Sequence, residues 1–251
     1  IYYFLGDNMS LAIKGFVESS LIEWEGNIVA ILFLPHCNMR CPYCHATHLV
    51  KKPNELESIP LEAVARSIEK KKDWLDGVVI SGGEPTFHDD LDELIAIFKN
   101  MGLKVRLDTN GTNPDRIEDL IQRELIDCIA MDIKAPLRDG KYNDVGGVLC
   151  SLPDLERSIK LIMESGLEYE FRTTVCPTFL TKADVVEIAQ SIAGASRYIL
   201  QSFRPTNCLD KSMFDVVPYS EDEIRDFAES ARKFVKNCHV RGEEVKALSC
   251  N

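Results

Sequence analysis

The stretch HCNMRCPYCH, residues 36–45, places Cys37, Cys41 and Cys44 within eight residues, directly after an apolar run. The apolar run, residues 28–34, predicts a buried strand, so the cysteines stand where that strand ends. Three thiolates on one short loop suit an iron–sulfur cluster, because such clusters are held by cysteine thiolates. A [4Fe–4S] cluster with only three cysteine ligands keeps one iron open, and an open metal position is where a substrate or cofactor binds.

A structural zinc site is the competing interpretation of the same loop. It needs a fourth ligand, for which His36, His45 and His48 are candidates. Zinc sites commonly combine two short ligand pairs, and the chain has no second Cys-x-x-Cys segment. Spacing alone therefore favours the cluster and leaves zinc open.

Outward from this loop, short apolar runs alternate with longer amphipathic stretches. The expected strands are residues 28–34, 77–81, 103–108, 127–134, 168–175 and 197–202. The expected helices are residues 60–74, 91–101, 114–123, 154–165, 182–193 and 220–235, and the longest irregular connection is 136–153. Strands this apolar, separated by helices, indicate a parallel sheet covered on at least one face. Six such units predict an α/β fold, a partial (βα)6 TIM-type barrel, with a doubly wound open sheet as the alternative.

Polar residues follow the carboxyl ends of these expected strands, where both candidate folds place their active groups. They are Cys37, Cys41 and Cys44 at the first strand, Gly82, Gly83 and Glu84 at the second, Asp108 at the third, Asp132 and Lys134 at the fourth, Arg172 in the fifth and Gln201 in the sixth. Because parallel strands end at one edge of a sheet, we expect these residues to share one rim.

The composition narrows the function classes. The chain has 29 basic and 40 acidic residues and a net charge of −11, which argues against nucleic acid as its main partner because no basic excess displaces counterions. No apolar run approaches the roughly 20 residues of a membrane span, and the first residues lack a secretion signal. We therefore expect a cytoplasmic protein. The chain does not begin with Met, and the predictions of fold and site use no residue before Leu11. Nine unevenly spaced cysteines argue against a disulfide framework.

Two motifs together resemble the signature of the radical S-adenosylmethionine (radical SAM) superfamily. The first is Cys-x-x-x-Cys-x-aromatic-Cys, with Tyr43 at the aromatic position, and the second is SGGEP at residues 81–85. The resemblance covers residues 14–235 and implies a single domain, 1–251, with a (βα)6 partial barrel. It implies that S-adenosyl-L-methionine chelates the open iron of the cluster through its amino and carboxylate groups. Zinc then drops out as an alternative.

The resemblance also implies which residues bind the cofactor. Tyr43 lies in the cysteine loop, and Gly82 and Gly83 permit close backbone approach, so that a carbonyl there can accept from the cofactor's ammonium. Glu84 can fix this loop or the ammonium.

The segments LDTNG, residues 107–111, and MDIK, residues 131–134, match glycyl-radical activating enzymes. In that resemblance Asp108 and Asp132 hold a monovalent cation, and Lys134 contacts the cofactor carboxylate. Arg172 alternates with apolar residues, should point into the barrel, and needs an anion there. Gln201 stands where some relatives of this group carry a histidine, so position alone assigns it to the cofactor.

Further segments resemble the compact activating proteins of anaerobic ribonucleoside-triphosphate reductase. They are residues 15–16, 19–26, 202–205 and 207–210. The resemblance implies an oxidoreductase whose reduced cluster cleaves S-adenosyl-L-methionine to methionine and a 5′-deoxyadenosyl radical. That radical would take a hydrogen from a glycine of a glycyl-radical enzyme, and a flavodoxin- or ferredoxin-type protein would supply the electron.

Two alternatives stay open beside activation. One is a radical SAM enzyme that acts on a small molecule, like 7-carboxy-7-deazaguanine synthase. The other is a non-catalytic iron–sulfur protein that transfers electrons or senses redox state, although such a protein needs no SGGEP motif. The six scattered cysteines are expected to be structural or free thiols. A second cluster at Cys208, Cys238 and Cys250 is disfavoured by their wide spacing.

Overall fold

The architecture is taken from a computed structural model, which describes residues 11–138 and 140–242. Eight strands form one sheet in the order of the chain, β1 to β8. They are β1 (Gly15–Ser20), β2 (Val29–Leu34), β3 (Gly77–Gly82), β4 (Lys104–Thr109), β5 (Cys128–Asp132), β6 (Glu168–Val175), β7 (Tyr198–Ser202) and β8 (Cys238–Val240). Every pair from β2 to β8 is parallel, and β1 runs antiparallel to β2.

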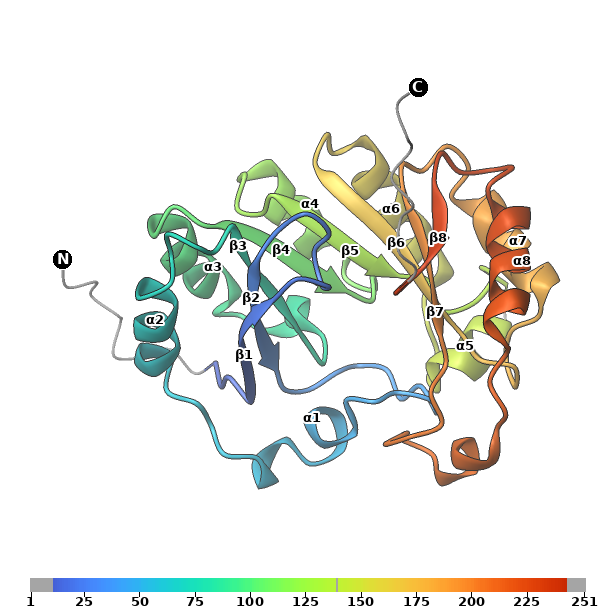
Figure 1. Cartoon of the computed structure of the whole chain (residues 1–251), viewed down its shortest axis with the longest axis horizontal. Coiled ribbons are helices and arrows are strands. Elements are labelled where there is room, and N and C mark those ends of the chain that lie inside the picture. Colours follow the sequence, from blue (N-terminus) through green and yellow to red (C-terminus); the bar gives the residue numbers. More distant parts are fainter. Residues whose placement is uncertain (1–10, 139, 243–251) are drawn as a thin grey trace.

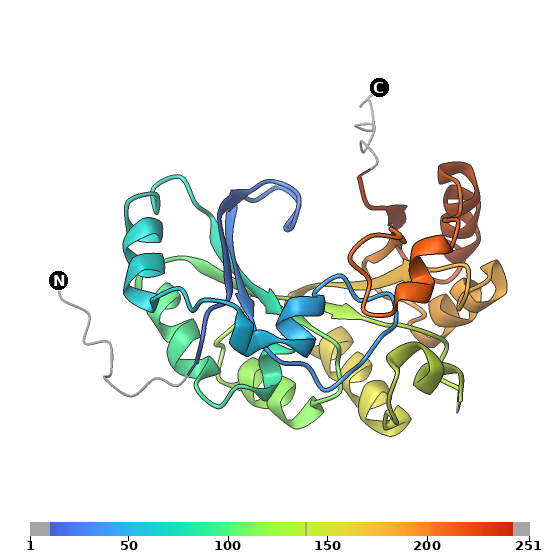
Figure 2. The same ribbon diagram turned by 90° about the horizontal axis from the view of Figure 1, so that it is seen from below.

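The strand order decides between the two expected folds. A doubly wound sheet reverses its order at a switch point, whereas here each strand lies beside its sequence neighbours throughout. The sheet is curved, and helices cover its outer face (Figures 1 and 2). Its edge strands β1 and β8 do not pair with each other in the described residues. The expected partial barrel with a (βα)6 core is confirmed, and the doubly wound alternative is wrong.

The described residues form eight α-helices, of which the six longest lie in the expected stretches. They are α1 (Thr47–Lys51), α2 (Leu61–Glu69), α3 (Leu91–Asn100), α4 (Pro114–Gln122), α5 (Lys141–Gly146), α6 (Leu152–Glu164), α7 (Lys182–Ser191) and α8 (Glu221–Ala231), with 3-10 turns η1 (Pro53–Glu55), η2 (Pro85–Phe87) and η3 (Lys211–Asp215). Capping boxes begin α7 at Thr181 and α8 at Ser220, where a side-chain oxygen accepts from a backbone N–H that the helix leaves unpaired.

Side chains of the inner strands alternate between two environments. In β4, Val105 and Leu107 pack with the helices on the outer face, whereas Arg106 and Asp108 make ion pairs on the inner face. A second apolar cluster around Trp24 includes Val29, Ile31, Val79 and Cys128. The inner face is thus apolar near the strands' amino ends and charged toward their carboxyl ends.

Four elements were not expected from the sequence. β1 is a half-exposed strand with mixed residues, GFVESS, and β8 has only three residues, so neither has the continuous apolar run of a buried strand. α1 and α5 are short, with five and six residues. α5 lies inside the stretch 136–153, which was expected to be irregular, so that prediction is wrong there.

Candidate active site

The cysteine loop crosses the carboxyl end of the barrel from β2 toward the far strands (Figure 1). Backbone hydrogen bonds fix both of its sides. The N–H of Arg40 donates to the carbonyl of Gly146 in α5 (2.8 Å), and the N–H of Asp210 donates to the carbonyl of Pro42 (2.9 Å). The loop is therefore held by segments that lie more than a hundred positions away in the chain.

The three thiols of this loop suit a cluster better than a single ion. Burial raises the pKa of Cys37, and it raises the pKa of Cys41 to about 12, so both thiols are protonated at neutral pH when no metal is bound. Within residues 11–138 and 140–242, no three Cys, His, Asp or Glu side chains converge to hold one metal ion. A cubane binds each thiolate to a different iron, so its cysteines lie farther apart than the ligands of a single ion. The residues present fit a [4Fe–4S] cluster.

A cavity of about 760 Å³ lies directly against this loop. Its walls include the cysteine loop, the ends of β3 to β7 and the residues after β8. Of the expected site residues it is lined by Cys37, Cys41, Tyr43, Cys44, Gly82, Gly83, Asp108, Asp132, Lys134, Arg172 and Gln201. The structure therefore brings eleven of the twelve expected residues to one chamber, and Glu84 is the exception.

Gly82 and Gly83 let two loops approach each other. A Cβ on Gly83 would lie 1.6 Å from the carbonyl oxygen of His36, and one on Gly82, whose φ is +126°, would lie 2.3 Å from backbone atoms of Leu34. The N–H of Gly83 donates to Leu34 O (2.8 Å). The glycines are thus required to pack the β3 loop against the cysteine loop, whatever they contribute to cofactor binding.

Glu84 is 1% exposed and holds the β3 and β4 loops together. Its carboxylate accepts from Thr86 N (3.1 Å) and Oγ1 (2.7 Å), from Thr109 Oγ1 (2.8 Å) and from Asn110 N (2.6 Å). Four donors satisfy the carboxylate within the protein. Of the two expected roles, the geometry supports fixing the loop and leaves no free oxygen facing the cavity.

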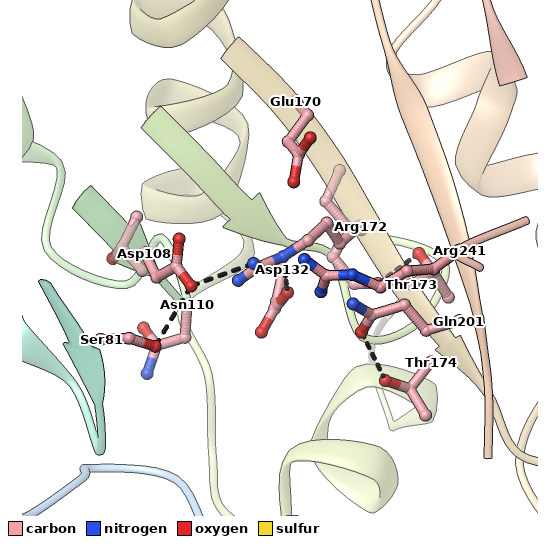
Figure 3. A network of polar contacts seen from close by, with 12 residues as sticks. Ser81, Asp108, Asn110, Asp132, Glu170, Arg172, Thr173, Thr174, Gln201 and Arg241 are labelled. Carbon is pink, nitrogen blue, oxygen red and sulfur yellow. Dashed lines mark hydrogen bonds and ion pairs between the residues drawn. The ribbon is translucent and has the colours of Figure 1, made fainter. Parts of the chain in front are cut away.

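Charged side chains from β4, β5 and β6 form one network on the inner face (Figure 3). Arg172 Nη1 lies 3.0 Å from Asp108 Oδ2, and Arg172 Nε lies 2.8 Å from Asp132 Oδ1. Lys134 Nζ is 3.5 Å from Asp132 Oδ2. Arg172 finds the anion that its position required, in the form of two aspartates.

The network shifts the pKa values of its members. Burial opposes ionisation of Asp108, but attraction to Arg172 and Arg106 outweighs it and lowers the pKa to about 2. Burial likewise opposes the charge of Lys134, yet Asp132 raises its pKa well above the usual value. Asp108, Asp132 and Lys134 are therefore all charged at neutral pH. The monovalent cation stays a prediction. In this structure Arg106, Arg172 and Lys134 supply the positive charges next to the two aspartates.

Several residues of the network were not expected. Arg106, 1% exposed, pairs with Asp108 Oδ1 (3.0 Å) and with Glu170 Oε1 (2.8 Å) deeper in the barrel. Asn110 Nδ2 donates to Asn38 Oδ1 (2.8 Å) and lies 3.8 Å from Cys37 Sγ. Alternation of charged with apolar residues in β4 and β6 is the signal that could have found Arg106 and Glu170.

Tyr43 and Gln201, two of the expected residues, line the cavity and each contacts a neighbouring side chain. The Tyr43 ring lies 6.1 Å from that of Phe179, centre to centre, and is mostly buried. Thr174 Oγ1 donates to Gln201 Oε1 (3.3 Å), which leaves the Gln201 amide nitrogen toward the chamber (Figure 3). The scattered cysteines Cys128, Cys150, Cys176, Cys208 and Cys238 are free thiols, and Cys250 lies outside the described residues.

Comparison with known proteins shows the family. The profile of the Radical SAM superfamily matches residues 31–192, which hold the cysteine loop and five strands of the barrel. The chain belongs to the radical SAM superfamily. A protein of Methanocaldococcus jannaschii, provisionally named a glycyl-radical enzyme activating enzyme, is 32% identical over 240 residues, which are 93% of this chain and 97% of that one. The 7-carboxy-7-deazaguanine synthase of a Synechocystis species is 32% identical over 91 residues, 36% of this chain and 42% of that enzyme.

Solved structures show the same radical SAM fold. Streptococcus suis SuiB bound to its precursor peptide SuiA superposes with a TM-score of 0.65 at 18% identity, over 85% of this chain and 48% of SuiB. TYW1 with a lysine–pyruvate adduct gives a TM-score of 0.60 at 18% identity, over 82% of this chain and 73% of TYW1. At this identity the likeness concerns the fold alone. In the described part of this radical SAM chain, no helix has the length and apolar character to cross a membrane.

Proposed function

We propose that this radical SAM enzyme activates a glycyl-radical enzyme of the anaerobic ribonucleoside-triphosphate reductase type by taking a hydrogen atom from one of its glycines. The observation that carries the proposal is the match to the Methanocaldococcus jannaschii protein, which extends over 97% of that relative. A match of this extent includes the segments on both sides of the residues that match the superfamily profile, 31–192. The SSLIEWEG segment, residues 19–26, and the DTNG segment, residues 108–111, also resemble activating proteins.

The chain's own residues would divide the work as follows. Cys37, Cys41 and Cys44 would hold three irons of a [4Fe–4S] cluster and leave the fourth for S-adenosyl-L-methionine. When bound, the cluster and this cofactor supply an electron and a 5′-deoxyadenosyl radical. Lys134 offers a cation to the cofactor carboxylate, while the aspartates balance the charge of Lys134 and Arg172. The walls of the 760 Å³ chamber would exclude water from the radical.

The small-molecule alternative is supported by a shorter match. The match to 7-carboxy-7-deazaguanine synthase covers about a third of this chain, 36%, so it supports the shared cofactor site more than a shared substrate.

A flavodoxin- or ferredoxin-type protein is proposed as the electron donor.

An anaerobic activation assay tests the proposal. The reconstituted protein, dithionite and S-adenosyl-L-methionine are mixed with the anaerobic ribonucleoside-triphosphate reductase of the same organism. We expect an EPR doublet from a glycyl radical on the reductase and one 5′-deoxyadenosine for each radical formed. Cys41→Ala is the control and should give neither product.

The opposite outcome is also defined. If 5′-deoxyadenosine accumulates while the reductase stays free of a glycyl radical, activation of this partner is wrong. Turnover of the small-molecule substrate of 7-carboxy-7-deazaguanine synthase by the same preparation would then support the alternative.

A further inference from the structure

Residues 21–28 join β1 to β2, and residues 21–27 of this connection are called here the hairpin tip. The tip reaches over the inner side of the sheet (Figure 1). Arg241, directly after β8, contacts it: Arg241 Nη2 lies 2.7 Å from Glu23 Oε2 and 3.3 Å from the carbonyl oxygen of Ile22. The hairpin tip thus links the first and last strands across the gap of the open barrel.

Two further contacts fix the hairpin tip. Trp24 is 1% exposed and packs among Val29, Ile31 and Val79 inside the barrel. The carboxylate of Glu25 forms an ion pair with Arg197, just before β7. With Glu23, three consecutive side chains of the tip are anchored to three different parts of the barrel, so its backbone has little freedom.

The two residues before these anchors point outward. Leu21 is 71% exposed and Ile22 is 75% exposed. Single exposed apolar residues are common on protein surfaces and need no explanation. Two adjacent ones on an anchored segment are different, because the anchors prevent them from turning toward the core, and a rigid apolar surface loses little entropy when it binds a partner.

The hairpin tip lies where the active chamber opens. Glu23 and Arg241 line the chamber, and a second cavity of about 1110 Å³ continues between β8 and α8. The two cavities share Ser202, Glu221, Arg241 and Gly242. A chain segment that enters from the side of β8 therefore passes Arg241 and the adjacent hairpin tip before it reaches the cysteine loop.

We infer that the hairpin tip is a docking surface for the protein substrate, with Leu21 and Ile22 as its apolar contacts. The inference rests on the proposed function: a radical confined to the chamber can reach a glycine only if a loop of the partner enters. The body of the partner must then rest on the surface around the opening. Apolar contact suits this role because burial of apolar surface is favourable whatever the net charge of the partner.

Paired variants test the inference in the activation assay. In Leu21→Ser/Ile22→Ser we expect the reductase concentration for half-maximal activation to rise roughly tenfold or more, as for loss of central apolar contacts in an interface. Iron content and the slow cleavage of S-adenosyl-L-methionine without reductase should stay at wild-type values, since neither residue lines a cavity. Trp74→Ser is the matched control, because Trp74 is 77% exposed and lines neither cavity.

Each result has one meaning. An unchanged half-maximal concentration in the double variant, with normal activation by the wild type, overturns the docking surface and leaves the proposed function standing. An equal rise in Trp74→Ser overturns it as well, because the effect would then belong to exposed apolar residues in general. Failure of the wild type to form any glycyl radical overturns both.

Discussion

Arg172 and Asp108 lie 64 positions apart in the chain, and their side chains form an ion pair of 3.0 Å in which neither is more than 10% exposed. The same guanidinium also binds Asp132 at 2.8 Å. A planar guanidinium can serve two carboxylates at once, which a lysine ammonium does less well. One residue of β6 therefore fixes the orientation of acids from β4 and β5 beneath the cofactor chamber.

Replacing Arg172 by Met should destabilise the fold. Breaking a buried pair costs about 3–5 kcal/mol because it leaves an uncompensated charge. Asp108 would keep Arg106 and Ser81 as partners, so we expect a loss of about 3 kcal/mol, at the lower end of that range. Urea unfolding of the anaerobic apoprotein, followed by circular dichroism, measures the change.

Lys182→Met provides the comparison, because Lys182 pairs with Asp226 in an exposed ion pair. Such pairs contribute about 0–1 kcal/mol. Equal losses of stability in the two variants would contradict a special role for the buried network.

The same network predicts how the fold responds to acid. Burial disfavours the charge of Asp108, but the two arginines overcome it and lower its pKa to about 2 from a usual 3.8. A carboxyl with a lowered folded pKa adds stability above its unfolded pKa and loses it as pH falls toward the folded pKa. In Arg172→Met the folded pKa rises, so the acid-unfolding midpoint should move to higher pH. Circular dichroism of the apoprotein between pH 5 and pH 1 (about the range in which such carboxyls titrate) follows it, and a midpoint equal to the wild type would contradict the assignment.

Gly83→Ala tests the contact between the β3 loop and the cysteine loop. The new Cβ would lie 1.6 Å from His36 O, a backbone atom that cannot move aside without displacing the loop that begins with Cys37. We expect the variant to reconstitute with a small fraction of the wild-type iron. Gly102→Ala is the control: its φ is +81°, but nothing lies within 4 Å of the added Cβ. It should lose about 1–2 kcal/mol of stability from backbone strain and keep its iron. Normal iron in Gly83→Ala would show that the two loops can separate without harm.

The sequence predicted those parts of the molecule that depend on local patterns. The run VAILFL of β2 is apolar at every position, as a strand covered on both faces must be, so its place and the cysteine loop after it could be read directly. The rim followed from the rule that parallel strands end together. Asp132 and Gln201 were predicted from strand ends alone, and both line the chamber although they lie on different strands, β5 and β7.

What the sequence did not show depends on contacts between distant segments. β8 is three residues long and is a strand only because β7 lies beside it. The sequence predicts that Glu84 fixes its loop or binds the cofactor ammonium. Only the positions of Thr109 and Asn110 show that its carboxylate oxygens already accept hydrogen bonds within the protein. The ion pair between Glu23 and Arg241 joins residues 218 positions apart, which no local pattern can reveal.

The last prediction concerns which thiols hold the cluster. Cys37, Cys41 and Cys44 line the chamber, so replacing any one by Ala should leave a reconstituted protein with little iron and no EPR signal from a reduced cluster. Cys208 is the sharpest control: it is buried, and it lies in the segment whose Asp210 N–H binds Pro42 of the cysteine loop.

The Cys208 thiol is already used within its own segment, since it donates to the carbonyl of Arg204 at 3.5 Å. Cys208→Ala should therefore keep near wild-type iron, with a stability loss of about 1 kcal/mol from the small cavity that the missing sulfur leaves. If it lost as much iron as Cys44→Ala, the thiol would be a ligand and the cluster would have no open iron. S-adenosyl-L-methionine would then have no metal position to bind, and the reaction proposed for this chamber would fail with it.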